Sequence, residues 1–179
     1  MWTPDGRRVI WTSTRGGGNP NVYWQAADGT GMAERLTTSV TAQFPTSISP
    51  DGTRIALFGG GATSALDIGT LALGGSATQP LKLEPLIEST AAKFDPEISP
   101  DGRWIAYASN ESGQFQVFVR PFPNVNEGRW QISPEGGTRP AWARDGKELF
   151  YLDANDLLTR RCRFSRRPQD SRPGPRPGF

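Results

Sequence analysis

The sequence contains no histidine and a single cysteine, Cys162. Without histidine, the chain cannot assemble a Ser-His-Asp or Cys-His catalytic group, a histidine metal site or a histidine proton shuttle from its own residues. One cysteine cannot close a disulfide within the chain or build a cysteine-based zinc site. No apolar run reaches the roughly 18 residues that a transmembrane helix needs. These absences exclude several common enzyme classes and predict no membrane span.

The 179 residues are 35% hydrophobic and include 21 Gly and 16 Pro. This composition favours many short strands joined by turns over long helices. The charge is unevenly placed. Residues 160–179 hold seven Arg and one Asp, a net charge of +6, whereas residues 1–159 hold 13 Lys and Arg against 17 Asp and Glu, a net charge of −4. The chain is therefore predicted to have a mildly acidic folded body and a basic tail.

One unit is repeated four times along the body. Its copies read WTPDGRRVIWTST, ISPDGTRIALFGG, ISPDGRWIAYASN and WARDGKELFYLDA, and their aspartates are Asp5, Asp51, Asp101 and Asp145. Further segments repeat around this core, such as FPTSIS and FDPEIS before it and NVYWQAA and QVFVRPF after it. Each complete unit is predicted to hold four short strands, here named a to d in chain order.

The repeated turn has a structural explanation. Proline fixes φ near the value that the second residue of a type I turn needs, aspartate suits the third residue, and glycine accepts the positive φ that closes the hairpin. We therefore assign a structural role in the turn between strands a and b to the following residues: Pro50, Asp51, Gly52, Pro100, Asp101, Gly102, Asp145 and Gly146. The fourth copy has Arg144 in place of proline, so its turn is less pre-organised.

The strands that follow these turns, VIWTS and WIAYAS, are apolar on both faces. Such strands are covered on both sides of their sheet. Four-stranded units of about 40 to 50 residues that stack radially and cover one another form a β-propeller. The sequence thus predicts an all-β fold, with blades at about 1–40, 41–90, 91–135 and 136–159.

The pattern P-x-x-S-P-D-G-x-x-I-A-Y-x-S resembles the WD40-like repeats of TolB-type propellers. The segments QVFVRPFPNVNEGRWQIS and GGTRPAWARDGKELFYLD are similar to the propellers attached to bacterial eukaryotic-like serine/threonine kinases. The resemblance covers residues 1 to about 158 and carries no kinase or peptidase motif with it. It implies a binding, sensing or scaffold role and a bacterial extracytoplasmic location, although MWTPDGRRVIW is not predicted to be a signal peptide.

Propellers typically need 4 to 8 blades to close, and this chain encodes about three and a half. An open arc would expose an apolar blade face at each end. We therefore expect a homo-oligomer, in particular a dimer that closes one ring, and we allow for another protein as partner. A ligand would lie in the central channel or on the face that carries the a–b turns.

Two carboxylates are the best candidates for chemistry. Asp95 and Glu97 in FDPEIS lie two residues apart, so in a regular extended strand they project to one face. Strand a lines the channel, and a dimer would present the pair twice. Such a cluster could bind a divalent cation and activate water. A weak metal-dependent hydrolase is therefore the alternative to a non-enzymatic module; the competing interpretation is that both residues are solvated.

The remaining candidates have simpler explanations. Asp153 and Asp156 fit an ordinary Asx turn, Arg120 fits packing at a strand end, and the six tryptophans are predicted to fill the space between blades. The Arg- and Pro-rich tail, 160–179, is predicted to be disordered. It could act as an arm for nucleic acid or anionic lipid, but a solvated tail without that function is the preferred interpretation.

Overall fold

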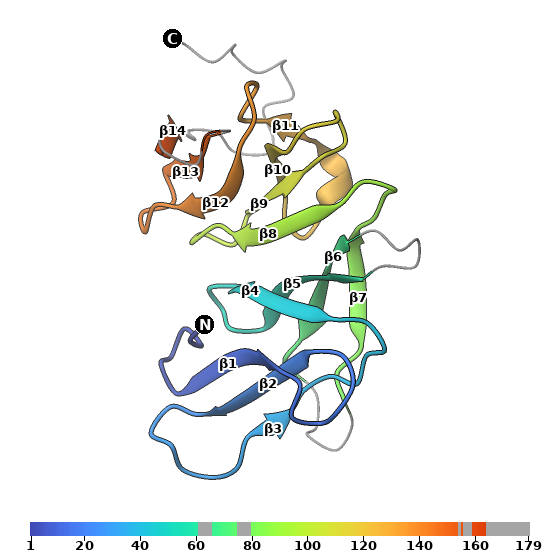
Figure 1. The fold of residues 1–179 in the computed structure, drawn as a ribbon. Coiled ribbons are helices and arrows are strands. Elements are labelled where there is room, and N and C mark those ends of the chain that lie inside the picture. Colours follow the sequence, from blue (N-terminus) through green and yellow to red (C-terminus); the bar gives the residue numbers. More distant parts are fainter. Residues whose placement is uncertain (61–65, 75–79, 154, 156–158, 164–179) are drawn as a thin grey trace.

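The computed structural model describes residues 1–60, 66–74, 80–153, 155 and 159–163. Its strands form four antiparallel sheets, which follow one another along an arc (Figure 1). Apart from one short 3-10 helix, η1 (Val125–Glu127), every regular element in the described ranges is a strand. The predicted all-β, partial-propeller fold is confirmed.

Each sheet corresponds to one sequence repeat, and the sheets are named blades 1 to 4. Blade 1 contains β1 (Arg8–Ser13), β2 (Asn21–Ala26) and β3 (Glu34–Arg35). Blade 2 contains β4 (Gln43–Ile48), β5 (Arg54–Gly60), β6 (Leu66–Ala72) and β7 (Leu83–Ile87). Blade 3 contains β8 (Lys93–Ile98), β9 (Trp104–Ser109), β10 (Gln116–Pro121) and β11 (Trp130–Gln131). Blade 4 contains β12 (Thr138–Trp142), β13 (Glu148–Leu152) and β14 (Thr159–Arg163).

Blades 2 and 3 have all four strands, whereas the two end blades are incomplete within the described residues. In blade 1, strand a is reduced to a single bridge between Trp2 and Val9. In blade 4, β14 is the third strand and pairs with β13 from Glu148 to Leu152. This pairing corrects the predicted start of the tail at residue 160, because Arg160 to Arg163 form a strand; an Arg-rich segment can pair through its backbone whatever its side chains are. The rest of the predicted tail, 164–179, lies outside the described residues.

The a–b turns have the hydrogen bonds that the turn chemistry requires. The Asp51 carboxylate accepts the backbone N–H of Thr53 at 3.0 Å, and Asp101 accepts that of Arg103 at 3.1 Å. In the fourth copy Asp145 accepts the N–H of Lys147 at 3.0 Å. The next residue in these turns is glycine with φ between 69° and 72°, the left-handed region that residues with a Cβ rarely adopt.

Successive turns also touch one another. A Cβ at Gly102 would lie 3.2 Å from Pro50 Cγ, and one at Gly146 would lie 3.7 Å from Pro100 Cδ. Pro4 stands in the same relation to Gly52, at 3.7 Å. The proline of each turn therefore packs on the glycine of the next blade's turn, so the repeated motif joins blades as well as strands.

Three apolar clusters fill the spaces between neighbouring blades. The cluster between blades 1 and 2 includes Ile10, Val22, Ile55, Leu57 and Leu71. The cluster between blades 2 and 3 includes Ala56, Ile68, Ile105, Tyr107 and Phe118. The cluster between blades 3 and 4 includes Trp104, Ala106, Val117, Trp142 and Leu149. Alternate residues of β9 thus face opposite neighbours, and all six residues of this strand are buried.

Candidate functional site

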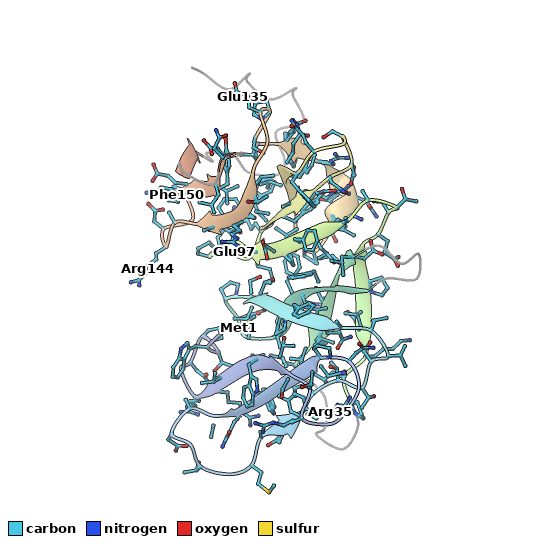
Figure 2. All side chains as sticks on the ribbon, in the orientation of Figure 1. Met1, Arg35, Glu97, Glu135, Arg144 and Phe150 are labelled. Atoms are coloured by element: carbon cyan, nitrogen blue, oxygen red, sulfur yellow. The ribbon has the colours of Figure 1, made fainter. Side chains whose placement is uncertain are left out.

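The two predicted candidate carboxylates lie on β8, on the side of blade 3 that meets blade 4. Figure 2 shows Glu97 near the end of β8, beside blade 4. The strand is not regular at this point. Its register against β9 shifts between Phe94 and Glu97, and Asp95 has a left-handed φ of 49°. The expectation of a regular strand from Asp95 to Glu97 is therefore wrong, because a bulge interrupts the two-residue alternation, although both side chains interact with blade 4.

Glu97 connects the two blades. Its Oε2 accepts the backbone N–H of Trp142 at 3.3 Å, and its backbone carbonyl accepts the Trp142 indole N–H at 3.0 Å. Burial raises the pKa of the Glu97 carboxyl to about 7, although the Trp142 N–H acts in the opposite direction. The side chain thus carries a proton in a large part of the molecules near neutral pH, and one of its oxygens is already engaged.

Asp95 occupies a different environment. Burial raises the pKa of this carboxyl, and the positive charge of Arg139 on blade 4 lowers it. Arg139 stands at the matching position of β12 and also has a left-handed φ, of 50°. The bulge of strand a is therefore repeated in blades 3 and 4, and it places an acid on one blade and a base on the next.

This arrangement does not gather a metal centre from the described residues. Within them, no group of three or more cysteine, aspartate or glutamate side chains lies close enough to bind one ion. What Glu97 does in the structure is receive hydrogen bonds from blade 4.

The matching joint between blades 2 and 3 uses a hydroxyl instead. Ser47, at the position equivalent to Glu97, accepts the backbone N–H of Ile98 at 3.0 Å and donates to the Pro96 carbonyl at 3.1 Å. Sequence reasoning missed this joint. The signal was present, since Ser47 and Glu97 are the only polar residues at that position in the four repeats, where Met1 and Ala141 complete the set.

A buried ion pair was also missed. Lys93 at the start of β8 is fully buried, and its Nζ donates to Asp67 Oδ1 on β6 at 3.0 Å and to the Ala91 carbonyl at 2.8 Å. The pair connects blades 3 and 2. The equivalent residues one blade earlier are Gln43 and Asn21, both uncharged, and the Oε1 atom of Gln43 is buried without a hydrogen-bond partner in the described part of the chain.

The other predicted candidates have structural surroundings. Asp153 accepts the N–H of Asn155 at 2.9 Å, as an Asx turn requires; Asp156 lies outside the described residues. Arg120 donates to the Tyr107 hydroxyl at 2.9 Å and to the Val125 carbonyl at 3.1 Å. The prediction that every tryptophan fills space between blades is wrong for Trp2 and Trp130, which are 60% and 38% exposed; the structure has no blade before Trp2.

No helix in the described ranges is long and apolar enough to cross a membrane. No family model matches the sequence. One curated protein, dipeptidyl aminopeptidase BI from Pseudoxanthomonas mexicana, is 34% identical over 73 residues, which is 38% of this chain and 10% of that protein.

Solved structures match over most of this chain. A putative TolB from Agrobacterium tumefaciens superimposes with a TM-score of 0.73 at 21% identity over 88% of this chain, and TolB from Acinetobacter baumannii with 0.66 at 20% identity over 90%. The chain spans 54% and 42% of the lengths of those two proteins. At these identities the likeness concerns the fold, and the molecule is a partial TolB-like β-propeller.

Proposed function

We propose that the chain is a non-enzymatic binding and scaffold module, which associates with a second copy to complete a propeller ring. Two arcs of about three and a half blades give seven or eight blades, within the range of 4 to 8 in which propellers close. The ligand, another protein in the first instance, would be bound in the channel or on the face that carries the a–b turns. The TolB-like fold also favours an extracytoplasmic location in a bacterium.

The observation that carries this proposal is the contrast between equivalent residues. Ile10, Ala56 and Ala106 occupy the same position of strand b in blades 1, 2 and 3, face the next blade and are all 0% exposed. Phe150 is their equivalent in blade 4 and is only half-buried. Phe150 therefore exposes apolar surface that a neighbouring blade covers at the equivalent positions of blades 1 to 3.

The open face of blade 1 shows the same contrast. Ile55 and Ile105, which face the preceding blade, are fully buried, whereas their equivalent Val9 is half-buried. Apolar surface therefore remains at both ends of the arc, and covering it is favourable by about 25 cal/mol for each Å² removed from water. A second copy offers both complementary faces at once.

The absolute mass in solution tests the proposal. Light scattering after size exclusion is expected to give twice the chain mass of 19.5 kDa over a range of micromolar concentrations. A chain that stays monomeric up to about 100 µM, where contacts weaker than about 5 kcal/mol go undetected, contradicts self-association.

A further inference from the structure

Trp2 is the exposed member of a set of equivalent residues. Its counterparts at the end of strand a in the other three blades are Ile48, Ile98 and Trp142. Each of those packs against the preceding blade: Ile48 in the cluster shared with blade 1, Ile98 in that shared with blade 2, and Trp142 in that shared with blade 3. Trp142 is 8% exposed and Trp2 is 60% exposed. The two indoles thus differ chiefly in whether a preceding blade is present.

The contacts of Trp142 define what such an indole needs. Its ring lies in an apolar cluster with Trp104 and Ala106 of blade 3, while its indole N–H donates to the Glu97 carbonyl at 3.0 Å. The required surface is thus an apolar strand b together with a backbone carbonyl of strand a. On its open side blade 4 offers Phe150 on β13, at the position of Ala106, and the exposed Ala141 on β12, at the position of Glu97, whereas Glu148 stands at the position of Trp104.

The contacts between successive turns also stop at blade 1 and at blade 4. Each of the first three turns packs its proline on the glycine of the following turn, but at Gly6 the point that a Cβ would occupy has no described atom within 4 Å. At the other end of the arc the proline is replaced by Arg144, which is exposed and extends away from blade 4 in Figure 2. Asp5, next to Gly6, is exposed as well. An arginine at one end would therefore meet an acid at the other.

We propose that Trp2 of one copy docks on the open face of blade 4 of a second copy, repeating the joint that Trp142 makes with blade 3. In this joint the indole packs against Phe150 and its N–H donates to the Ala141 carbonyl. Arg144 then lies beside the Asp5–Gly6 turn of the other copy. The inference rests on the proposed function, because it specifies the contact through which the chain self-associates.

The occupant is a second copy because the interface already exists three times within the chain. Blades 1 and 2, 2 and 3, and 3 and 4 are joined by the same strand positions, and the two open faces are the unpaired halves of that one interface. The joint is head to tail, and two copies related by a two-fold axis form it twice and close the ring. The acid and base at the turn add charge complementarity.

The experiment compares the dimer dissociation constants of the complete chain and three variants by light scattering or sedimentation. Trp2→Ala removes the indole, and Ala141→Lys places a long charged side chain on the exposed acceptor strand. Met32→Ala is the matched control, since Met32 is 87% exposed on the same blade as Trp2 but is not at a blade-facing position. Circular dichroism verifies that each variant is folded.

We expect Trp2→Ala and Ala141→Lys each to weaken dimerisation at least about tenfold, as truncation of an interface tryptophan typically does, and Met32→Ala to leave it unchanged. A head-to-tail joint also predicts complementation. In an equimolar mixture, blade 4 of the Trp2→Ala copy and blade 1 of the Ala141→Lys copy form one intact joint, so heterodimers appear where neither variant dimerises alone.

The outcomes separate the two proposals. A wild-type dimer that Trp2→Ala and Ala141→Lys leave intact overturns the Trp2 joint but not self-association. A wild-type monomer overturns both, and would be the result if Trp2 is covered instead by a preceding blade of a longer chain. Loss of dimer in both variants without recovery in the mixture also overturns the joint, because it indicates a symmetric contact rather than a head-to-tail one.

Discussion

The covered joint between blades 2 and 3 differs from the open faces of blades 1 and 4. Both are formed by equivalent positions of one sequence repeat. At the joint, Ala56 and Tyr107 are fully buried, and the fully buried Lys93 forms an ion pair with the largely buried Asp67. At the ends, Trp2, Val9 and Phe150 remain partly or largely exposed. Since the strands are alike, the difference comes from the neighbour. In a radial fold each sheet has two faces, and the stability of one blade depends on the next.

The largest expected effect is at the inner joint. Lys93→Met leaves Asp67 buried without its counter-charge and should lower the free energy of unfolding by about 3–5 kcal/mol. Urea denaturation measures the loss. The double variant Lys93→Met/Asp67→Asn should recover most of it, because no uncompensated charge remains.

The exposed pair of Arg54 and Glu84, 2.8 Å apart, supplies the control for this prediction. Glu84→Gln should change the stability by less than about 1 kcal/mol, because water screens exposed pairs. The importance of the buried pair would be refuted if Lys93→Met unfolded at the same urea concentration as Glu84→Gln.

A second prediction compares one position in a covered and an open blade. Ile10→Ala removes a side chain that is 0% exposed between blades 1 and 2, so it should cost about 2–4 kcal/mol through lost burial and the cavity left behind. Phe150→Ala removes a larger side chain, yet at concentrations where the chain is monomeric it should cost less than Ile10→Ala, because Phe150 is only partly buried and leaves no enclosed cavity. Denaturation at low protein concentration tests both; equal losses would mean that the face of Phe150 is covered.

A third and smaller effect depends on pH. The folded-state pKa of Glu97, about 7, lies above its ordinary value of 4.5, so the folded chain binds this proton more tightly than the unfolded chain does. The corresponding stability is fully present below about pH 4.5 and is lost as the pH rises through 7. The loss should amount to about 2 kcal/mol, allowing for the partial exposure of the group.

Glu97→Gln removes this titration and leaves an amide oxygen to accept the Trp142 N–H. The variant should therefore be more stable than the wild type at pH 8 and nearly equal to it at pH 4.5, as read from urea denaturation across the pH range. Glu88→Gln, at an exposed glutamate, is the control and should follow the wild-type curve. If the two variants show the same pH dependence, Glu97 does not titrate as its burial implies.

Sequence patterns were sufficient to predict the blades because their signals are local. The turn residues from Ser99 to Gly102 require no tertiary contact to favour a hairpin, and the apolar runs around Ile55 and Ile105 indicate strands covered on both faces. The orientation of the Asp95 and Glu97 side chains could not be predicted reliably, because the prediction assumed a regular extended backbone. The positive φ of Asp95 is set by the bulge against β9.

The sequence by itself therefore determined the repeat, the turn chemistry and the strand order within each blade. Only the tertiary structure decided which polar residues join blades, namely Ser47, Glu97 and the pair of Lys93 and Asp67, and which of two equivalent tryptophans is covered. The physical reason is distance along the chain. Turns and strands follow from neighbouring residues, whereas burial and hydrogen bonds between blades depend on partners about fifty residues away or on another copy.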